Sequence, residues 1–176
     1  DPKGAEWKGL SPAGKSLVNE AVKLGIVIDQ SHASDAVFDN LIEMMPVPFI
    51  LSHSSAKAVF NHPRNLDDAR RRQRAAKGGV IQANAYGGYL VDIPKVPEKE
   101  AALEALSEKF GPEERLPTSR VTAYLSERRA IEARYSVKRA TFDDYMSHLL
   151  HIIRVAGVDH VGIGADHGKA VGFVVD

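Results

Sequence analysis

Hydrophobic residues are concentrated in four short runs along this chain, at residues 26–28, 49–51, 80–85 and 161–164. Runs of this length that are rich in β-branched and aliphatic residues are typical of strands buried on both faces of a sheet. They predict strands over 26–31, 49–53, 80–85 and 161–166. The first two runs each lead into a polar turn and then into a helix-like segment.

The segments between these runs carry apolar residues at the spacing of an amphipathic helix. They predict helices over 12–24, 35–44, 67–77, 98–109, 118–134 and 141–156. Side chains that can accept hydrogen bonds from the first helical N–H groups precede several of these segments. The expected N-caps are Ser11, Ser34, Asn65 and Thr141, and Asp144 would complete a capping box with Thr141.

Strands that alternate with helices favour a parallel sheet with right-handed crossovers. Four such units fit either a small open α/β domain or half of a (β/α)8 barrel of the TIM type. Residues 90–138 interrupt the alternation, because this segment is long, charged and proline-containing. We interpret it as a helical insertion in a strand-to-helix loop, where lids and pocket walls are usually found.

The composition, 44% hydrophobic and 26% charged over 176 residues, is that of a soluble globular protein with one domain or a large piece of one. Basic and acidic residues balance at 23 each, so no overall field attracts nucleic acid or an anionic membrane. The absence of cysteine excludes disulfides, thiolate metal sites and a cysteine nucleophile. No apolar run approaches the ~20 residues of a membrane span, and no signal peptide is recognisable. The sequence therefore leaves the location undecided between the bacterial cytoplasm and the periplasm.

The expected helix over 67–77 is rich in arginine, at Arg70, Arg71, Arg72 and Arg74. Aromatic residues do not interleave with these arginines, as they would on a surface that binds single-stranded nucleic acid. We therefore interpret the arginines as a solvated helix face.

Two histidines share one local context, since His32 and His53 each follow a serine at the end of an expected strand. The carboxyl ends of parallel strands meet at one rim, where α/β folds place their ligands. Neutral imidazoles are good ligands for Zn²⁺, so the pair indicates a shared metal ion, with structural hydrogen bonding as the alternative. Two ligands are too few, because a catalytic zinc takes at least three from protein.

Further polar residues are expected on the same rim. Asp166 ends the fourth strand, where it can ligate metal, hold a substrate amine, exchange protons or cap a helix. Arg64 follows the second histidine, and its guanidinium suits either a substrate carboxylate or a surface ion pair. Asn84 and Tyr89 lie at the end of the third strand and could complete the pocket.

The other histidines are interpreted as structural, with His62 in a loop and His148 and His151 exposed on, or capping, the helix over 141–156.

Serine hydrolysis is the rival chemistry. The candidate nucleophiles are Ser31, Ser52 and Ser54. No G-x-S-x-G motif surrounds any of them, which argues against this alternative.

Four segments together resemble a known family: IDQSHASD, ILSHSSAKAVFNHPRNLDD, GGVIQANAYGGYL and AGVDHVGIGAD. They are similar to segments of the membrane (renal) dipeptidase family, zinc-dependent peptidases with a (β/α)8 barrel and a binuclear metal site. The resemblance runs from about Gly9 to Asp166 and includes the insertion. It implies that residues 1–176 supply about the last four βα units of such a barrel.

The resemblance also implies a role for each candidate residue. His32 and His53 would hold the second of two zinc ions, and Arg64 would receive the carboxylate of a dipeptide, with help from Tyr89. Asp166 would contact the substrate nitrogen and assist proton transfer. The implied reaction is attack of a metal-bridging hydroxide on the dipeptide carbonyl, since two metals lower the pKa of water and polarise the carbonyl.

The chain departs from the family pattern in several places. A first-strand His-x-Asp pair, a bridging Glu and a further substrate-binding His have no counterpart in residues 1–176, and the end from His167 onward is off pattern. The leading hypothesis is a dipeptidase that is complete only with an N-terminal half, so the isolated chain should be inactive and should be unstable or dimerise. The alternatives are a non-catalytic remnant or interaction module, and another metal-dependent amidohydrolase-like enzyme.

Overall fold

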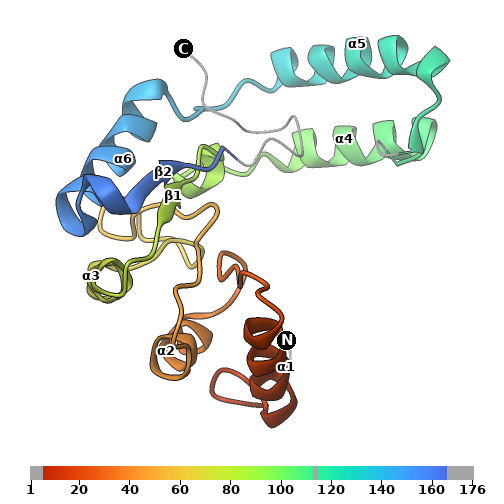
Figure 1. Ribbon diagram of the computed structural model, residues 1–176. Coiled ribbons are helices and arrows are strands. Elements are labelled where there is room, and N and C mark those ends of the chain that lie inside the picture. Colours follow the sequence, from red (N-terminus) through yellow and green to blue (C-terminus); the bar gives the residue numbers. More distant parts are fainter. Residues whose placement is uncertain (1–5, 113–114, 166–176) are drawn as a thin grey trace. The chain divides into compact units, whose positions relative to one another are not determined.

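The computed structural model describes residues 6–112 and 115–165 (Figure 1). The chain divides into two compact units, one within residues 1–92 and 139–176 and the other within residues 93–138. The second unit falls inside the segment expected to be an insertion, and its place in a barrel stays a prediction. Asp166, a predicted site residue, lies outside the described residues.

The helices of the first unit begin and end close to the predicted residues. They are α1 Pro12–Lys23, α2 Asp35–Met44, α3 Asp68–Ala76 and α6 Phe142–Ala156, with the short 3₁₀ helices η1 Gly87–Tyr89 and η3 Val158–His160. Ser11 and Ser34 accept hydrogen bonds from helical N–H groups, as predicted. Thr141 and Asp144 form the predicted capping box at the start of α6.

The N-cap predicted for α3 was wrong. Asp67, not Asn65, caps this helix, and its carboxylate accepts the N–H of Arg70 at 3.0 Å. Asn65 is buried instead, and its side-chain amide donates to the carbonyl oxygens of Phe60 and Tyr89 at 2.9 and 2.8 Å. Because the Asn65 amide binds these loop carbonyls, its side chain is not available to cap the helix, and Asp67, two residues later, does so.

The predicted strand segments pair in parallel and in chain order, but the sheet is shorter than predicted. Its two regular strands are β1 Ile81–Ala83 and β2 Val161–Ile163, which pair in parallel (Figure 1). Single parallel bridges join Asp29 to Ile50 and Leu51 to Ile81. The first two predicted strands are thus reduced to bridges, yet all four segments run in the same direction and end on one side.

The first predicted strand is not buried on both faces. Ile26 and Val27 are 55% and 62% exposed, whereas Ile28 packs against the core. The N–H of Ile26 donates to the carbonyl of Ala21, which holds it at the end of α1 rather than in the sheet. Among the described residues this segment pairs only with the stretch around Ile50, so nothing covers its other edge.

The core of the first unit lies between the sheet segments and the helices. Its fully buried large apolar side chains are Phe38, Phe49, Leu41, Leu51, Ile81, Leu90 and Ile152. The rings of Phe38 and Phe49 meet edge to face at 5.3 Å, a favourable aromatic geometry that joins α2 to the second strand segment. This packing fixes the strand ends that carry the candidate site.

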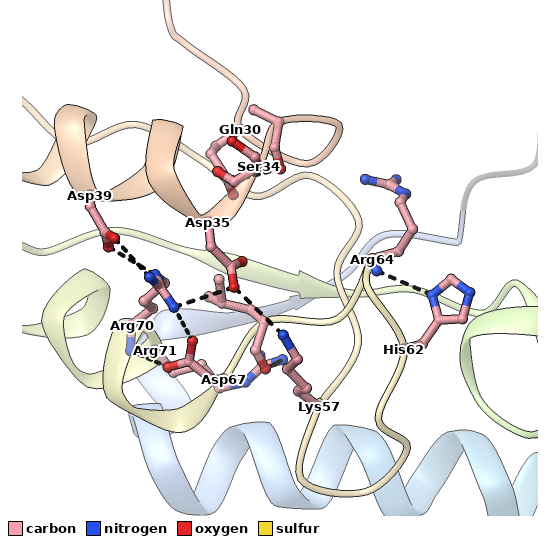
Figure 2. Close-up of polar contacts among 12 residues, drawn as sticks. Gln30, Ser34, Asp35, Asp39, Lys57, His62, Arg64, Asp67, Arg70 and Arg71 are labelled. Carbon is pink, nitrogen blue, oxygen red and sulfur yellow. Dashed lines mark hydrogen bonds and ion pairs between the residues drawn. The ribbon is translucent and has the colours of Figure 1, made fainter. Parts of the chain in front are cut away.

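Ion pairs add a second connection between α2 and α3. The guanidinium of Arg70 donates to both carboxylate oxygens of Asp39, at 2.8 and 2.7 Å, and also pairs with Asp35 and Asp67 (Figure 2). The Lys57 ammonium lies 3.5 Å from the Asp35 carboxylate. The bidentate contact is directional, so it fixes the orientation of the two helices more than it stabilises the fold.

The interpretation of the α3 arginines as a solvated face was wrong for Arg71 and Arg74. Both side chains are fully buried, and burial lowers the pKa of each guanidinium to about 10. Arg71 donates to the carbonyls of Ser55 and Leu66, and the Arg74 guanidinium lies 4.3 Å from the ring centre of Phe49. Because α3 has few apolar residues, the long arginine stems fill its inward face.

The second unit is a pair of helices, α4 Pro97–Phe110 and α5 Thr118–Arg134. They pack through a small cluster of Leu106, Phe110 and Tyr124, and the Lys109 ammonium pairs with Glu127 at 2.7 Å. Within the described part of the chain, no helix combines the length and the apolar character needed to cross a membrane.

Candidate functional site

The structure brings the two predicted metal-ligand histidines together. The Nε2 atoms of His32 and His53 lie 2.9 Å apart, and the ring planes are tilted by 56°. Two nitrogens that each lie ~2.0–2.1 Å from one tetrahedral zinc would be about 3.4 Å apart. A small outward movement of the rings would therefore let both nitrogens reach one ion.

The surrounding strand ends hold these histidines in place. The bridge between Asp29 and Ile50 aligns the two Ser-His pairs, and the N–H of His53 donates to the Ser31 hydroxyl at 3.1 Å. The hydroxyl oxygens of Ser31 and Ser52 lie 3.3 Å apart. The repeated sequence context thus corresponds to two matching strand ends that face each other.

Asp29 organises this pair of strand ends through four hydrogen bonds. The N–H and hydroxyl of Ser31 donate to its Oδ1 at 3.0 and 2.7 Å, and the N–H of Ser52 donates to the same oxygen at 3.2 Å. The hydroxyl of Ser52 donates to Oδ2. Burial raises the pKa of this carboxyl, but the hydrogen bonds outweigh burial and lower it to about 2, so Asp29 is ionised at neutral pH.

Asp29 was not among the residues that the sequence pattern predicted for this site. A signal was present, because a carboxylate within a predicted strand requires hydrogen-bond partners. Its partners could not be identified from the sequence alone, since Ser52 is 23 residues away and reaches Asp29 only across the strand pairing.

Arg64 lies beside the histidine pair, as its place after the second strand suggested. Its Nη2 atom is 3.3 Å from Nε2 of His53, and its guanidinium carbon is 5.3 Å from the ring centre of Tyr89. The N–H of Arg64 donates to Nδ1 of His62 at 3.1 Å (Figure 2). Burial, and then the charge of Arg64, lower the pKa of His62, which favours the neutral ring that accepts this bond.

Aromatic rings line the loop next to Arg64. The His62 ring stacks on Phe60 with centroids 5.9 Å apart and contacts Tyr89 at 4.8 Å, and Tyr86 contacts Tyr89 at the same distance. The structure therefore places Tyr89 in a row of rings on which the arginine rests. Its predicted contact with substrate stays a prediction.

Asn84 occupies a more enclosed position than expected of a residue that completes a pocket. Its side chain is fully buried, and its Oδ1 accepts the N–H of Tyr86 at 2.6 Å. Its backbone carbonyl accepts the hydroxyl of Ser55 at 3.1 Å. These contacts give Asn84 a role in shaping the turn after β1, while substrate binding by this residue stays a prediction.

The expectation that His148 is exposed or caps a helix was wrong. His148 is fully buried, and its Nδ1 accepts the N–H of Ala56 at 3.0 Å. Its Nε2–H therefore donates to the carbonyl of Leu90, also at 3.0 Å. His151 is partly buried and contacts Asp68 of α3 at 2.8 Å. Both histidines join α6 to other segments.

The ligand set around His32 and His53 is incomplete within the described residues. No group of three or more His, Cys, Asp or Glu side chains among residues 6–112 and 115–165 is arranged to hold a metal ion. The two imidazoles fit a metal as a donor pair, and a full site would need further ligands.

Several known proteins similar to this chain are described as dipeptidases. The sequence model of the membrane dipeptidase family, peptidase family M19, matches residues 1–176. An uncharacterized dipeptidase of Schizosaccharomyces pombe is 31% identical over 163 residues, which cover 93% of this chain and 29% of that protein. Dipeptidase tcpJ of Claviceps purpurea is 27% identical over 90% of this chain and 27% of its own length. The chain thus spans less than a third of these curated relatives.

Solved structures agree with this relationship. The probable dipeptidase PvdM of Pseudomonas aeruginosa matches 96% of this chain and 44% of its own chain, with a TM-score of 0.67 and 28% identity. A metallopeptidase of Rhodobacter sphaeroides, liganded with a phosphinate mimic of the dipeptide L-Ala-D-Ala, matches 91% of this chain and 34% of its own, with a TM-score of 0.62 and 25% identity. The α/β fold is therefore similar to that of these dipeptidases, and the chain belongs to the membrane dipeptidase family, peptidase family M19.

Proposed function

We propose that residues 1–176 form part of a metal-dependent dipeptidase. The observation that carries this proposal is the convergence of two metal-ligand nitrogens and one guanidinium: Nε2 of His32 and Nη2 of Arg64 lie 2.9 and 3.3 Å from Nε2 of His53. A hydrolase that acts on short peptides needs an activated water and a cation for the free carboxylate in one place. Membership of peptidase family M19 supports the interpretation of these groups as two metal ligands beside a cation for the substrate carboxylate.

The proposed cofactor is zinc, with two ions in the complete enzyme and with His32 and His53 as ligands of one of them. When bound, the metal pair would lower the pKa of a water molecule and polarise the peptide carbonyl. Neutral imidazoles suit this role, because the unprotonated nitrogen is the ligand.

The proposed substrate is a dipeptide whose carboxylate is bound by Arg64. Two parallel N–H groups of a guanidinium can bind both oxygens of a carboxylate, and the Tyr89 ring below the guanidinium keeps it oriented. Asp166 is proposed to contact the substrate nitrogen and to assist proton transfer. Asn84 is retained as a candidate second contact on the same side.

The proposed active form contains more of the barrel than these residues. The relatives are longer than this chain, and the first predicted strand leaves Ile26 and Val27 exposed. Large exposed apolar side chains beside an unpaired strand edge favour coverage by further strands. We propose that a preceding half of a (β/α)8 barrel covers them and supplies the missing metal ligands.

Activity of the natural full-length chain tests this function. After loading with zinc it should hydrolyse unblocked dipeptides, lose activity on chelation and regain it when zinc is returned. His53→Gln should abolish hydrolysis, whereas the matched control His160→Gln should retain it, because His160 contacts the carbonyl of Gly79 rather than the site. No dipeptide hydrolysis by the zinc-loaded chain, or unchanged hydrolysis by His53→Gln, would contradict the proposal.

A further inference from the structure

A continuous set of hydrogen bonds links the carboxylate of Asp29 to His53, the proposed metal ligand. The hydroxyl of Ser52 donates to Oδ2 of Asp29, and the same hydroxyl oxygen lies 2.8 Å from Nδ1 of His53. The proposed reaction uses Nε2 of this ring, on the opposite side. The contacts of Nδ1 therefore act on the protonation of the ligand nitrogen, alongside the Arg64 guanidinium, whose Nη2 lies 3.3 Å from Nε2 and can only donate.

The direction of each hydrogen bond follows from counting protons. An ionised carboxylate only accepts, so the single hydroxyl proton of Ser52 is given to Asp29. The Ser52 oxygen is then an acceptor toward His53, and the proton between them belongs to Nδ1 of the ring. Ser31 does not compete for that position, because its own hydroxyl proton is donated to Asp29 at 2.7 Å.

We propose that Asp29, acting through Ser52, is a positioning residue that holds His53 in the Nδ1–H tautomer and directs the lone pair of Nε2 toward the metal. A neutral imidazole carries one ring proton, so fixing it on Nδ1 leaves Nε2 unprotonated. Hydrogen bonds of this kind orient ligand histidines in metal sites. The inference rests on the proposed function and adds to it two residues that do not touch the metal or the substrate.

A purely structural role for Asp29 is the competing explanation. Asp29 also binds two backbone N–H groups, of Ser31 and Ser52, and so ties the first two strand segments together. Loss of those bonds would lower stability without changing the tautomer of His53. The ring tautomer therefore separates the two explanations, and stability alone does not.

Asp29→Asn gives the sharpest test. In the wild-type chain, three N–H or O–H groups donate to Oδ1 of Asp29. In the variant, the carbonyl oxygen of the asparagine therefore takes the place of Oδ1, and its NH₂ group takes the place of Oδ2. The NH₂ group then donates to the Ser52 oxygen, whose proton turns toward Nδ1 of His53. The ring proton moves to Nε2, and the metal-binding lone pair is lost.

The measurement is the tautomer of His53 in the metal-free natural full-length chain labelled with ¹⁵N-histidine. Proton–nitrogen correlation spectra distinguish the tautomers, and the His53 signals are assigned by their loss in His53→Gln. Wild-type chain should show the Nδ1–H tautomer, Asp29→Asn the Nε2–H tautomer and Ser52→Ala a mixture. Ser54→Ala, which removes a neighbouring hydroxyl outside these hydrogen bonds, is the matched control and should resemble wild type.

Zinc affinity provides the second measurement, by competition with a chelating dye. Asp29→Asn and Ser52→Ala should each bind zinc about 10- to 100-fold more weakly than wild type and Ser54→Ala. Two results would overturn the inference: an Nε2–H tautomer in the wild-type chain, or the wild-type tautomer in both Asp29→Asn and Ser52→Ala. Neither result would contradict the proposed dipeptidase function. The predicted tautomers together with no zinc binding by wild type would instead overturn the proposed function.

Discussion

At the scale of single residues, the proposed binding of a substrate carboxylate by Arg64 is the feature that would distinguish a dipeptidase from a general metal hydrolase. Arg64→Lys in the natural full-length chain should lower kcat/KM for a dipeptide roughly 10- to 100-fold, because lysine offers one point charge where arginine offers two parallel donors. The measurement compares kcat/KM for a dipeptide and for the corresponding dipeptide amide, which lacks the carboxylate.

The amide is the internal control for this substitution. It should be a poor substrate of the wild-type enzyme and should lose little more in Arg64→Lys. Equal losses for the acid and the amide would mean that Arg64 supports the loop around His62 and His53 rather than the substrate.

His148 makes folding stability depend on pH. Burial lowers its pKa below the ordinary value of 6.5, and the charges of Arg71 and His151 lower it further, although the Leu90 carbonyl and Asp144 oppose them. The unfolded chain therefore takes up a proton first. The stabilisation is complete above about pH 6.5 and declines as the pH falls toward the lower pKa of the folded state, by at most about 1.4 kcal/mol per pH unit.

Denaturant unfolding at pH 7.5 and pH 5.5 measures this effect. His148→Gln keeps one acceptor and one donor but does not titrate, so its unfolding free energy should fall less between the two pH values than that of the wild type. An equal fall in both proteins would show that other groups cause the acid sensitivity.

The sequence predicted that the two histidines with a repeated local context would lie together, and it did not predict the contacts that depend on tertiary structure. His32 and His53 share a serine-histidine motif at strand ends, so their meeting followed from parallel pairing alone. The role of Asp29 depends on Ser52, which approaches it only after the strands pair. The burial of Arg74 depends on its contact with the Phe49 ring, and the sequence of α3 does not predict that contact.

At the scale of elements, a capping box of Thr141 and Asp144 stabilises the start of α6. Thr141 accepts the N–H of Asp144 at 3.2 Å and donates to its carboxylate at 2.9 Å. Thr141→Ala should lower the free energy of unfolding by about 1 kcal/mol. Thr141→Ser keeps the hydroxyl and should lose much less in the same denaturant titration, and equal losses would show that the cap contributes little.

Helices were predicted more accurately than strands for a physical reason. The ends of α1 and α6 are decided by Ser11, Thr141 and nearby backbone groups, all within four residues. A strand exists only where a partner pairs with it, and the partner is distant in sequence. The apolar run at Ile26 therefore looked like a strand but remains largely unpaired among the described residues.

At the scale of the whole molecule, exposed apolar residues predict that this chain does not work alone. Leu24, Ile26, Val27 and Ile163 are 75%, 55%, 62% and 69% exposed. Residues 1–176 expressed alone should therefore self-associate in sedimentation velocity and show no dipeptidase activity with added zinc. A stable monomer with full dipeptide turnover would contradict the proposed barrel half.

A metal ion shared by His32 and His53 is the central feature of the proposed site, and anomalous diffraction at the zinc edge tests for it most directly. Crystals of the zinc-loaded natural full-length chain should show an anomalous peak within ~2.0–2.1 Å of Nε2 of both histidines. The peak should be lost in His53→Gln and retained in His160→Gln. Zinc bound only at other sites, with no anomalous peak close to both imidazoles, would contradict the proposed shared metal.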